Sequence, residues 1–148
     1  MNMQITFDGA DIVEEAFVEI NNLDNATHAE EESVLDLERQ MLELDSRIMT
    51  VQLAVKGTEA AIMQTITTQM DATGKKMYPN AETRKAELER RMLDHDTRRE
   101  VAKLVQEKVD VEREQKTHML NIKMFGRRSR YLYARIEYLS LIMKGIGQ

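Results

Sequence analysis

Three histidines are the side chains of this sequence best suited to bind a metal ion or to transfer a proton near neutral pH. His28, His95 and His118 lie far apart, and no two of them stand four residues apart, the spacing at which helical histidines share a zinc ion. Asp94 and Asp96 flank His95, but neighbouring side chains of a helix point about 100° apart and do not converge. The sequence therefore predicts no metal, no cofactor and no catalytic residue.

The segment Thr73-Gly74-Lys75-Lys76 shares a glycine and a lysine with phosphate-binding loops. Gln69 stands where the first glycine of such a loop is required, and Lys76 replaces the hydroxyl residue that binds magnesium. We also expect a helix, not a strand, to lead into the segment. These departures favour a simple turn over a nucleotide site.

Residues 127–135 interleave arginines with tyrosines, a combination that can hold phosphates and stack on unpaired bases. Tyr131 and Tyr138 are expected on the apolar side of a helix. The candidate nucleic-acid contacts are therefore Arg127, Arg128, Arg130, Tyr133 and Lys144. The net charge of -5 opposes nucleic acid at long range unless the charges are segregated along the chain. A membrane surface is less favoured, because packing explains the apolar residues of this segment.

The charges are in fact unevenly distributed. Residues 1–50 carry thirteen acidic side chains and two arginines, whereas residues 123–148 carry six basic side chains and one acid. If the chain folds back near residue 77, residues 30–45 lie beside residues 109–124. The opposite charges therefore favour pairing within the chain, and the alternative is that the basic end binds an acidic partner such as nucleic acid.

One proline and six glycines in 148 residues are too few turn residues for a sheet protein. Two stretches with helical patterns, 27–73 and 80–125, are nearly equal in length and are separated by a turn at residues 74–79. Matched helices joined in this way fold back, so that each covers the apolar stripe of the other. We therefore expect a single all-α domain, 1–148, built on a long antiparallel helical hairpin of coiled-coil type, with short N-terminal and C-terminal packing helices.

Local signals suggest where each helix begins and ends. Thr27 and Glu30 have capping-box spacing, so the first long helix is expected to begin at residue 27, after an acidic lead-in and a short helix in residues 1–25. Gly57 marks a shift in its seam, Gly74 suits a left-handed end, and Asn80 suits the cap of the second long helix. The seam has steps of three and four residues: Val34, Leu37, Met41, Leu44, Ile48, Val51 and Val55.

Near the turn, the first long helix has more apolar side chains than the start of the second can cover. We expect a methionine-rich tip there that binds protein, because methionine adapts to varied surfaces. Burial by another copy of the chain fits equally well. The tip residues are Ile62, Met63, Ile66, Met70, Met77 and Tyr78.

Gly126 is expected to break the chain before a basic amphipathic helix in residues 127–146. Leu132, Ile136 and Leu139 form its apolar stripe, and Arg135 falls inside that apolar sector. An arginine there must reach water along its stem or meet a carboxylate, for which the acidic first fifty residues are the expected source.

These features predict a protein without catalytic activity, a structural or adaptor component of an assembly, with the build of small helical proteins of viral or mobile elements. Two long helices make a thin core, so we expect a homo-oligomer, with another protein bound through the tip or the seam. The alternative is a nucleic-acid-binding accessory factor of replication, recombination or repair. Without cysteine, a signal-peptide pattern or an apolar span, the expected location is cytoplasmic or otherwise intracellular, including a virion or the nucleoid.

Overall fold

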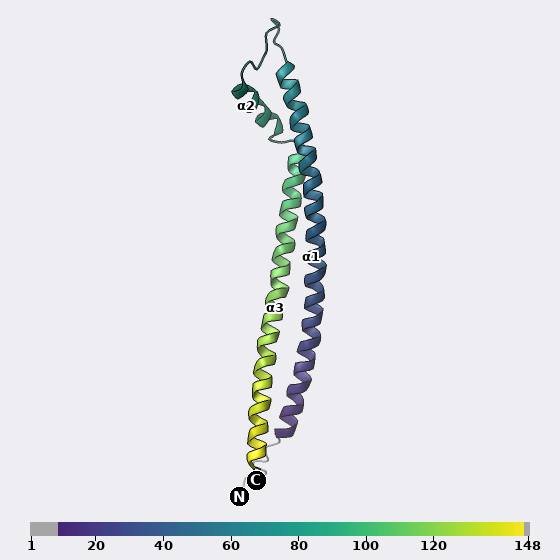
Figure 1. The fold of residues 1–148 in the computed structure, drawn as a ribbon, viewed down its shortest axis with the longest axis vertical. Coiled ribbons are helices and arrows are strands. Elements are labelled where there is room, and N and C mark those ends of the chain that lie inside the picture. The colour runs from purple at the N-terminus through teal and green to yellow at the C-terminus, as the bar shows by residue number, and fades with distance from the viewer. Residues whose placement is uncertain (1–8, 147–148) are drawn as a thin grey trace. The chain divides into compact units, whose positions relative to one another are not determined.

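The computed structural model describes residues 9–146, which fold into three α-helices (Figure 1). α1 spans Gly9–Thr68, α2 spans Ala81–Met92 and α3 spans Asp96–Ile146. Over residues 9–146 there is no strand, only an isolated bridge between Met70 and Lys76. The predicted all-helical class is confirmed. Residues 1–8 of the predicted lead-in lie outside the described residues.

The chain divides into two compact units, and α1 and α3 pack together in each of them. Met1–Glu38 and Arg113–Gln148 form the first, here named the terminal unit. Arg39–Glu112 forms the second, here named the turn unit, which also contains α2. The single domain expected from the helical hairpin stays a prediction.

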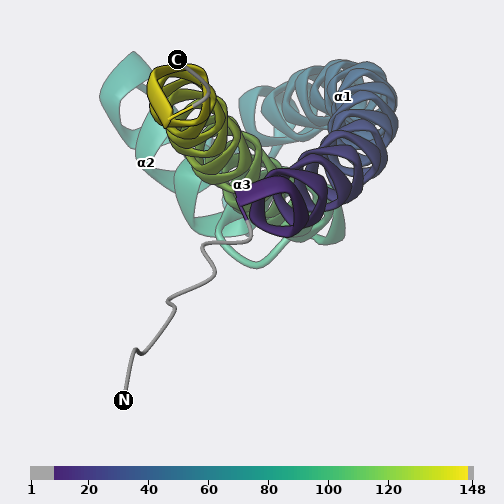
Figure 2. The same ribbon diagram turned by 90° about the horizontal axis from the view of Figure 1, so that it is seen from below.

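In the terminal unit, apolar side chains of α1 and α3 form one core. Ala16 and Ile20 of α1 pack with Leu132 and Ile136 of α3, and Ile20 and Leu132 are each only 2% exposed. The two helices lie side by side in both views of the molecule (Figures 1 and 2). Burial of such side chains is the main stabilising contribution to a helix pair in water.

Ion pairs show which residues of α1 lie beside which residues of α3. In the terminal unit, Glu19 pairs with Arg128 and Glu30 pairs with His118. In the turn unit, Asp45 bonds Lys108 at 2.6 Å and Glu59 bonds Arg98 at 3.2 Å. Within each unit, residue numbers therefore fall along α3 as they rise along α1. One of these pairs, Glu19–Arg128, joins the acidic residues 1–50 to the basic residues 123–148.

The expected helix boundary at Thr27 is wrong, because α1 continues through this residue. The Thr27 hydroxyl does not cap a helix but donates to the carbonyl of Leu23, one turn earlier, at 2.8 Å. The seam explains why the capping pattern was overridden: Leu23, Thr27, Glu30 and Val34 continue the steps of three and four, and all are partly buried. A separate short helix would have interrupted that packing.

The expected break at Gly126 is also wrong, since α3 passes through it. Glycine costs a helix only about 1 kcal/mol relative to alanine. The packed residues on both sides of Gly126 outweigh that cost. Gly57 lies inside α1, and a β-carbon added there would meet nothing within 4 Å, so no close helix crossing requires this glycine.

The second long helix was expected to be continuous over residues 80–125, but it is interrupted at residues 93–95, between α2 and α3. Asn80 caps α2 as predicted, because its side chain accepts a 2.8 Å hydrogen bond from the backbone N–H of Thr83. His95 plays a similar role for α3, where its Nδ1 accepts from the backbone N–H of Thr97 at 3.3 Å.

α1 ends at Thr68, five residues before the expected end at residue 73. A tight turn follows, in which Met77 N–H donates to the carbonyl of Gln69 at 3.0 Å. The Asp71 carboxylate accepts the backbone N–H groups of Thr73 and Lys75 at 2.9 and 3.0 Å. Such side-chain bonds compete with helical ones, which explains the early end. Gly74 has the predicted left-handed conformation, with φ of 80°.

Candidate interaction surfaces

The predicted tip residues differ in exposure. Ile66 is fully buried, and Ile62, Met63 and Tyr78 are partly buried. Met70 is 59% exposed and Met77 is 47% exposed. Both methionines belong to the chain reversal, in which Met70 is bridged to Lys76 and Met77 N–H donates to the carbonyl of Gln69. A protein contact at the tip stays a prediction, and the two methionines are its accessible part.

A network that the sequence did not reveal ties α2 to the end of α1. The Glu87 carboxylate accepts bonds from Arg90 and from Arg91, the latter at 2.6 Å. Arg91 also donates to the side-chain oxygen of Gln69 at 2.8 Å and lies 6.0 Å from the centre of the Tyr78 ring. The hydrogen bonds from Arg90 and Arg91 lower the pKa of Glu87 to about 2. In the sequence, the arginines three and four residues after Glu87 could have indicated the ion pairs of this network.

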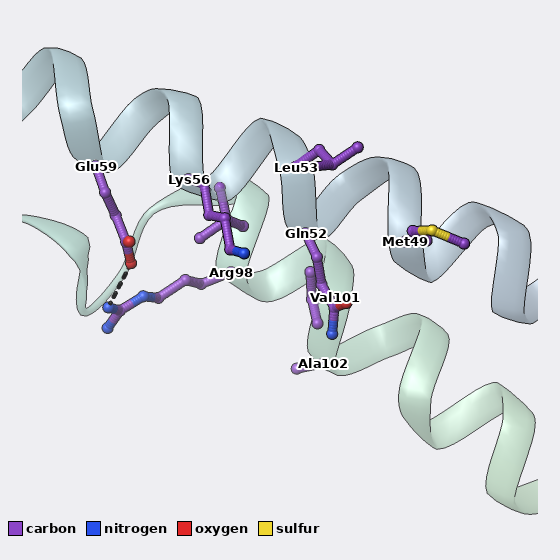
Figure 3. Close-up of a pocket in the computed structure, with 9 residues that line it drawn as sticks. Met49, Gln52, Leu53, Lys56, Glu59, Arg98, Val101 and Ala102 are labelled. Carbon is purple, nitrogen blue, oxygen red and sulfur yellow. Dashed lines mark hydrogen bonds and ion pairs between the residues drawn. The ribbon is translucent and has the colours of Figure 1, made fainter.

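Arg98 connects all three helices. It donates to Glu89 of α2 at 3.3 Å and to Glu59 of α1 at 3.2 Å, and these bonds raise its pKa further. Figure 3 shows its side chain reaching from the start of α3 toward Glu59. The two acids offset the charge of Arg98 at this point.

Beside Arg98, an open groove of about 660 Å³ is lined by α1 and α3 within the turn unit. Met49 and Leu53 line it from α1, and Val101 and Ala102 line it from α3 (Figure 3). Met49 is 61% exposed and Leu53 is 64% exposed. Large apolar side chains at the rim of an open groove are typical of a surface that binds another helix.

The groove belongs to a longer apolar surface, here named the turn-unit strip. Leu42 and Met49 each follow a seam residue of α1 by one position. On α3, Val105 follows the buried Leu104 and Val109 follows the partly buried Lys108. A step of one residue along a helix rotates the side-chain direction by about 100°. Because residue numbers fall along α3 as they rise along α1, this rotation points the exposed residues of both helices toward the same side of the helix pair. All members are exposed: Leu42, Met49, Leu53, Ala102, Val105 and Val109.

The predicted nucleic-acid contacts all lie on α3 in the terminal unit. Arg127, Arg130, Tyr133 and Lys144 are exposed. Arg128 instead bonds Glu19 at 2.8 Å, which lowers the pKa of Glu19 and raises that of Arg128. The Arg128 guanidinium also lies 5.3 Å from the centre of the Tyr131 ring. The structure thus commits one of the five candidates to a contact inside the chain.

Arg135, expected to pair with an acid of the first fifty residues, is exposed on α3. The charge of Arg135 helps to lower the pKa of Glu19, but the hydrogen bond to Glu19 comes from Arg128. Arg128 and Arg135 lie seven residues apart, about two turns of α3, and the sequence could not tell which of them reaches the carboxylate.

A polar layer interrupts the apolar seam of the terminal unit. Glu30 contacts Nδ1 of His118 and accepts a 3.1 Å bond from the side-chain amide of Asn121. The bonds from His118 and Asn121 lower the pKa of Glu30. The side chains of Glu30 and His118 are 20% and 25% exposed, so most of each is removed from water. Polar groups in a seam fix its register, because any shift leaves them unpaired.

The histidines do not gather into a site. His28 is exposed and lies 3.4 Å from Glu31, His95 caps α3, and His118 belongs to the polar layer. Among residues 9–146, no cluster of three or more histidines and acids is arranged to hold a metal ion. In the segment 73–76, Asp71 already occupies the backbone donors of Thr73 and Lys75, which a phosphate would need.

Comparisons with models of protein families, with curated proteins and with solved structures found no match for this chain. No helix within residues 9–146 combines the length and the apolar character needed to cross a bilayer.

Proposed function

We propose that this chain is a non-enzymatic structural or adaptor protein that associates with itself through a long antiparallel helical hairpin. The turn-unit strip carries the proposal. Leu42 and Met49 each expose more than three-fifths of their surface on one side of a helix pair, and Leu53, which also lines the groove, is as exposed. Removing apolar surface from water stabilises association by about 25 cal/mol per Å², so a second layer of helices on this side would gain from every member of the strip.

The charges around the strip favour a second copy as that layer. Asp45 is paired with Lys108, and Glu59 is paired with Arg98, so the acids and bases beside the strip neutralise each other within the chain. A two-fold axis brings a surface against itself, which requires that it carry no strong excess of one charge. The strip meets this requirement. Two hairpins facing each other in this way would form a four-helix bundle.

Sedimentation equilibrium of the full chain tests the proposal. One chain has a mass of 17.2 kDa, and we expect a larger mass that depends on concentration. The double variant Met49→Ser/Val105→Ser should raise the dissociation constant by about tenfold or more, because large side chains at the centre of an interface carry most of its energy. Both side chains are exposed, so the helical circular dichroism should not change.

Leu93→Ser is the matched control, because Leu93 is 72% exposed but lies outside the strip, between α2 and α3. It should leave self-association as in the wild type. A wild-type mass of one chain at every concentration would refute the proposal, and so would an unchanged mass in the strip variant.

Nucleic-acid binding is the second candidate function, and the exposure of Arg127, Arg130 and Tyr133 on α3 is the observation that favours it. A labelled single-stranded oligonucleotide should then bind in a salt-sensitive way, with loss of binding in Arg127→Ser/Arg130→Ser. The acid-rich α1 of the same unit opposes this function, since residues 9–38 contain ten acids and no lysine or arginine.

A further inference from the structure

A second exposed apolar surface lies on α3 in the terminal unit, here named the α3 stripe. It comprises Leu120, Met124, Tyr131, Tyr138 and Leu141, and each of these side chains is more than half exposed. The stripe was not foreseen, because Tyr131 and Tyr138 were expected to widen the core side of the helix.

The α3 stripe has the spacing of a coiled-coil seam. Its positions, with Arg127 and Ala134 between them, follow steps of four and three residues from 120 to 141. Tyr138 and Leu141 each come two positions after a buried residue of the core side, Ile136 and Leu139. Two positions correspond to a rotation of about 200°. The stripe therefore faces away from α1. Arg128 lies beside the Tyr131 ring, but Tyr131 remains more than half exposed.

The positions beside the stripe are strongly basic. Lys123, Arg130 and Lys144 border it on one side, and Arg128 and Arg135 border it on the other. Glu137 is the one acid among these flanking positions. A second copy of the same surface would place cations against cations, which costs stability. The α3 stripe thus differs from the turn-unit strip, whose flanking charges are balanced.

We propose that the α3 stripe binds an amphipathic helix of another protein, with apolar residues at heptad spacing and acidic residues on both flanks. The heptad steps supply holes for the partner's apolar side chains. Lys123, Arg130, Arg135 and Lys144 attract its acids, whereas Arg128 is already bonded to Glu19. A helix that contacts only the outer side of α3 stays on the basic side of the unit.

Two other anionic partners fit less well. The apolar positions form a narrow stripe interrupted by Arg127, whereas helices that lie on membranes present a broad apolar face. A lipid surface would also extend beyond α3 toward the acids of α1, which repel it. Nucleic acid offers bases to stack on tyrosines but nothing that matches Leu120, Met124 and Leu141 at heptad spacing.

The probe for this proposal is a synthetic, fluorescein-labelled helical peptide of about three to four heptads, with leucine in the seam and glutamate at both flanking positions. A second peptide, used for comparison, has lysine in place of glutamate. Anisotropy titrations with the full chain should show that the acidic peptide binds about tenfold or more tightly than the lysine peptide, and that salt weakens the binding.

Tyr131→Ser/Tyr138→Ser should weaken binding of the acidic peptide about tenfold or more. Tyr133→Ser is the matched control: Tyr133 is an exposed tyrosine of the same helix outside the stripe, and its loss should change nothing. Arg130→Glu/Arg135→Glu should reduce or reverse the preference for the acidic peptide. All these side chains are exposed, and circular dichroism checks that each variant keeps its helix content.

Equal binding of the two peptides, or no binding of either, would overturn the proposal. Binding of anionic phosphatidylserine vesicles or of a single-stranded oligonucleotide, lost in the tyrosine double variant while the acidic peptide does not bind, would assign the surface to that partner instead. The proposal is independent of self-association: Met49→Ser/Val105→Ser should leave peptide binding unchanged even where it makes the chain monomeric.

Discussion

At the residue scale, the most informative contact is the polar layer of Glu30, His118 and Asn121 in the seam of the terminal unit. Sequence spacing placed Glu30 in a capping box, whereas the structure places it against α3. Both interpretations use the same carboxylate, and only the partner helix decides between them. Three polar groups that satisfy one another fix the register of α1 against α3, because a slide by one turn would leave a carboxylate facing apolar side chains.

The polar layer predicts a pH dependence of stability. Because the bonds from His118 and Asn121 lower the pKa of Glu30 below its ordinary value of 4.5, the charged carboxylate stabilises the folded chain above pH 4.5. That contribution is lost as the pH falls through the lowered pKa. Glu30→Gln should therefore unfold at lower urea concentration than the wild type at neutral pH, and the difference should shrink in acid.

Urea unfolding followed by circular dichroism at several pH values measures this difference. Glu32→Gln is the control, since Glu32 is exposed two positions away on the same helix and should cost little at any pH. If Glu30→Gln and Glu32→Gln behave alike, the polar layer does not stabilise the register.

At the element scale, the sequence predicts the seam residues that repeat at helical spacing. It does not predict where packing against another helix outweighs a local signal that would end a helix. Leu37, Leu44, Leu132, Ile136 and Leu139 were assigned to helix seams from spacing alone, and all are buried. The turn at Gly74 and the cap at Asn80 also follow from local chemistry. The breaks expected at Thr27 and Gly126 are absent, because continuous packing against the other helix outweighs a weak local signal.

The candidate surfaces were less predictable, for a physical reason. Exposure depends on which side of a helix its neighbour occupies, and periodicity alone cannot say this when apolar residues occur on two sides. Tyr131 and Tyr138 illustrate the point: they were expected in the core, yet Leu132 and Ile136 occupy it. Ile66 illustrates the opposite case, an expected contact residue that is fully buried.

At the element scale, replacing Gly126 and replacing Gly74 by alanine should change the free energy of unfolding in opposite directions. A β-carbon at Gly126 meets nothing within 4 Å inside a helix, so Gly126→Ala should stabilise the chain by about 0.5–1 kcal/mol. Gly74 has φ of 80°, so Gly74→Ala should destabilise the turn by about 1 kcal/mol or more. Urea unfolding by circular dichroism measures both. A stabilising effect at Gly74 would contradict the left-handed turn, and a loss at Gly126 would contradict the uninterrupted α3.

At the scale of the whole molecule, α1 and α3 each belong to both compact units, so the question is whether a defect in one unit loosens the other. Leu132→Ala removes a core side chain of the terminal unit, and Ile66→Ala removes a fully buried one of the turn unit. Each change should cost about 2–5 kcal/mol, depending on how far the site collapses.

Because helix stability in water comes mostly from local packing, each defect should act first on its own unit. Hydrogen exchange measured by mass spectrometry should show faster exchange of residues 9–38 and 113–146 in Leu132→Ala, with residues 39–112 close to wild type. Ile66→Ala should give the reverse pattern. Equal acceleration along the whole chain in both variants would mean that the two units open in a single cooperative step, and the turn-unit strip could then not persist as a binding surface when the terminal unit loosens.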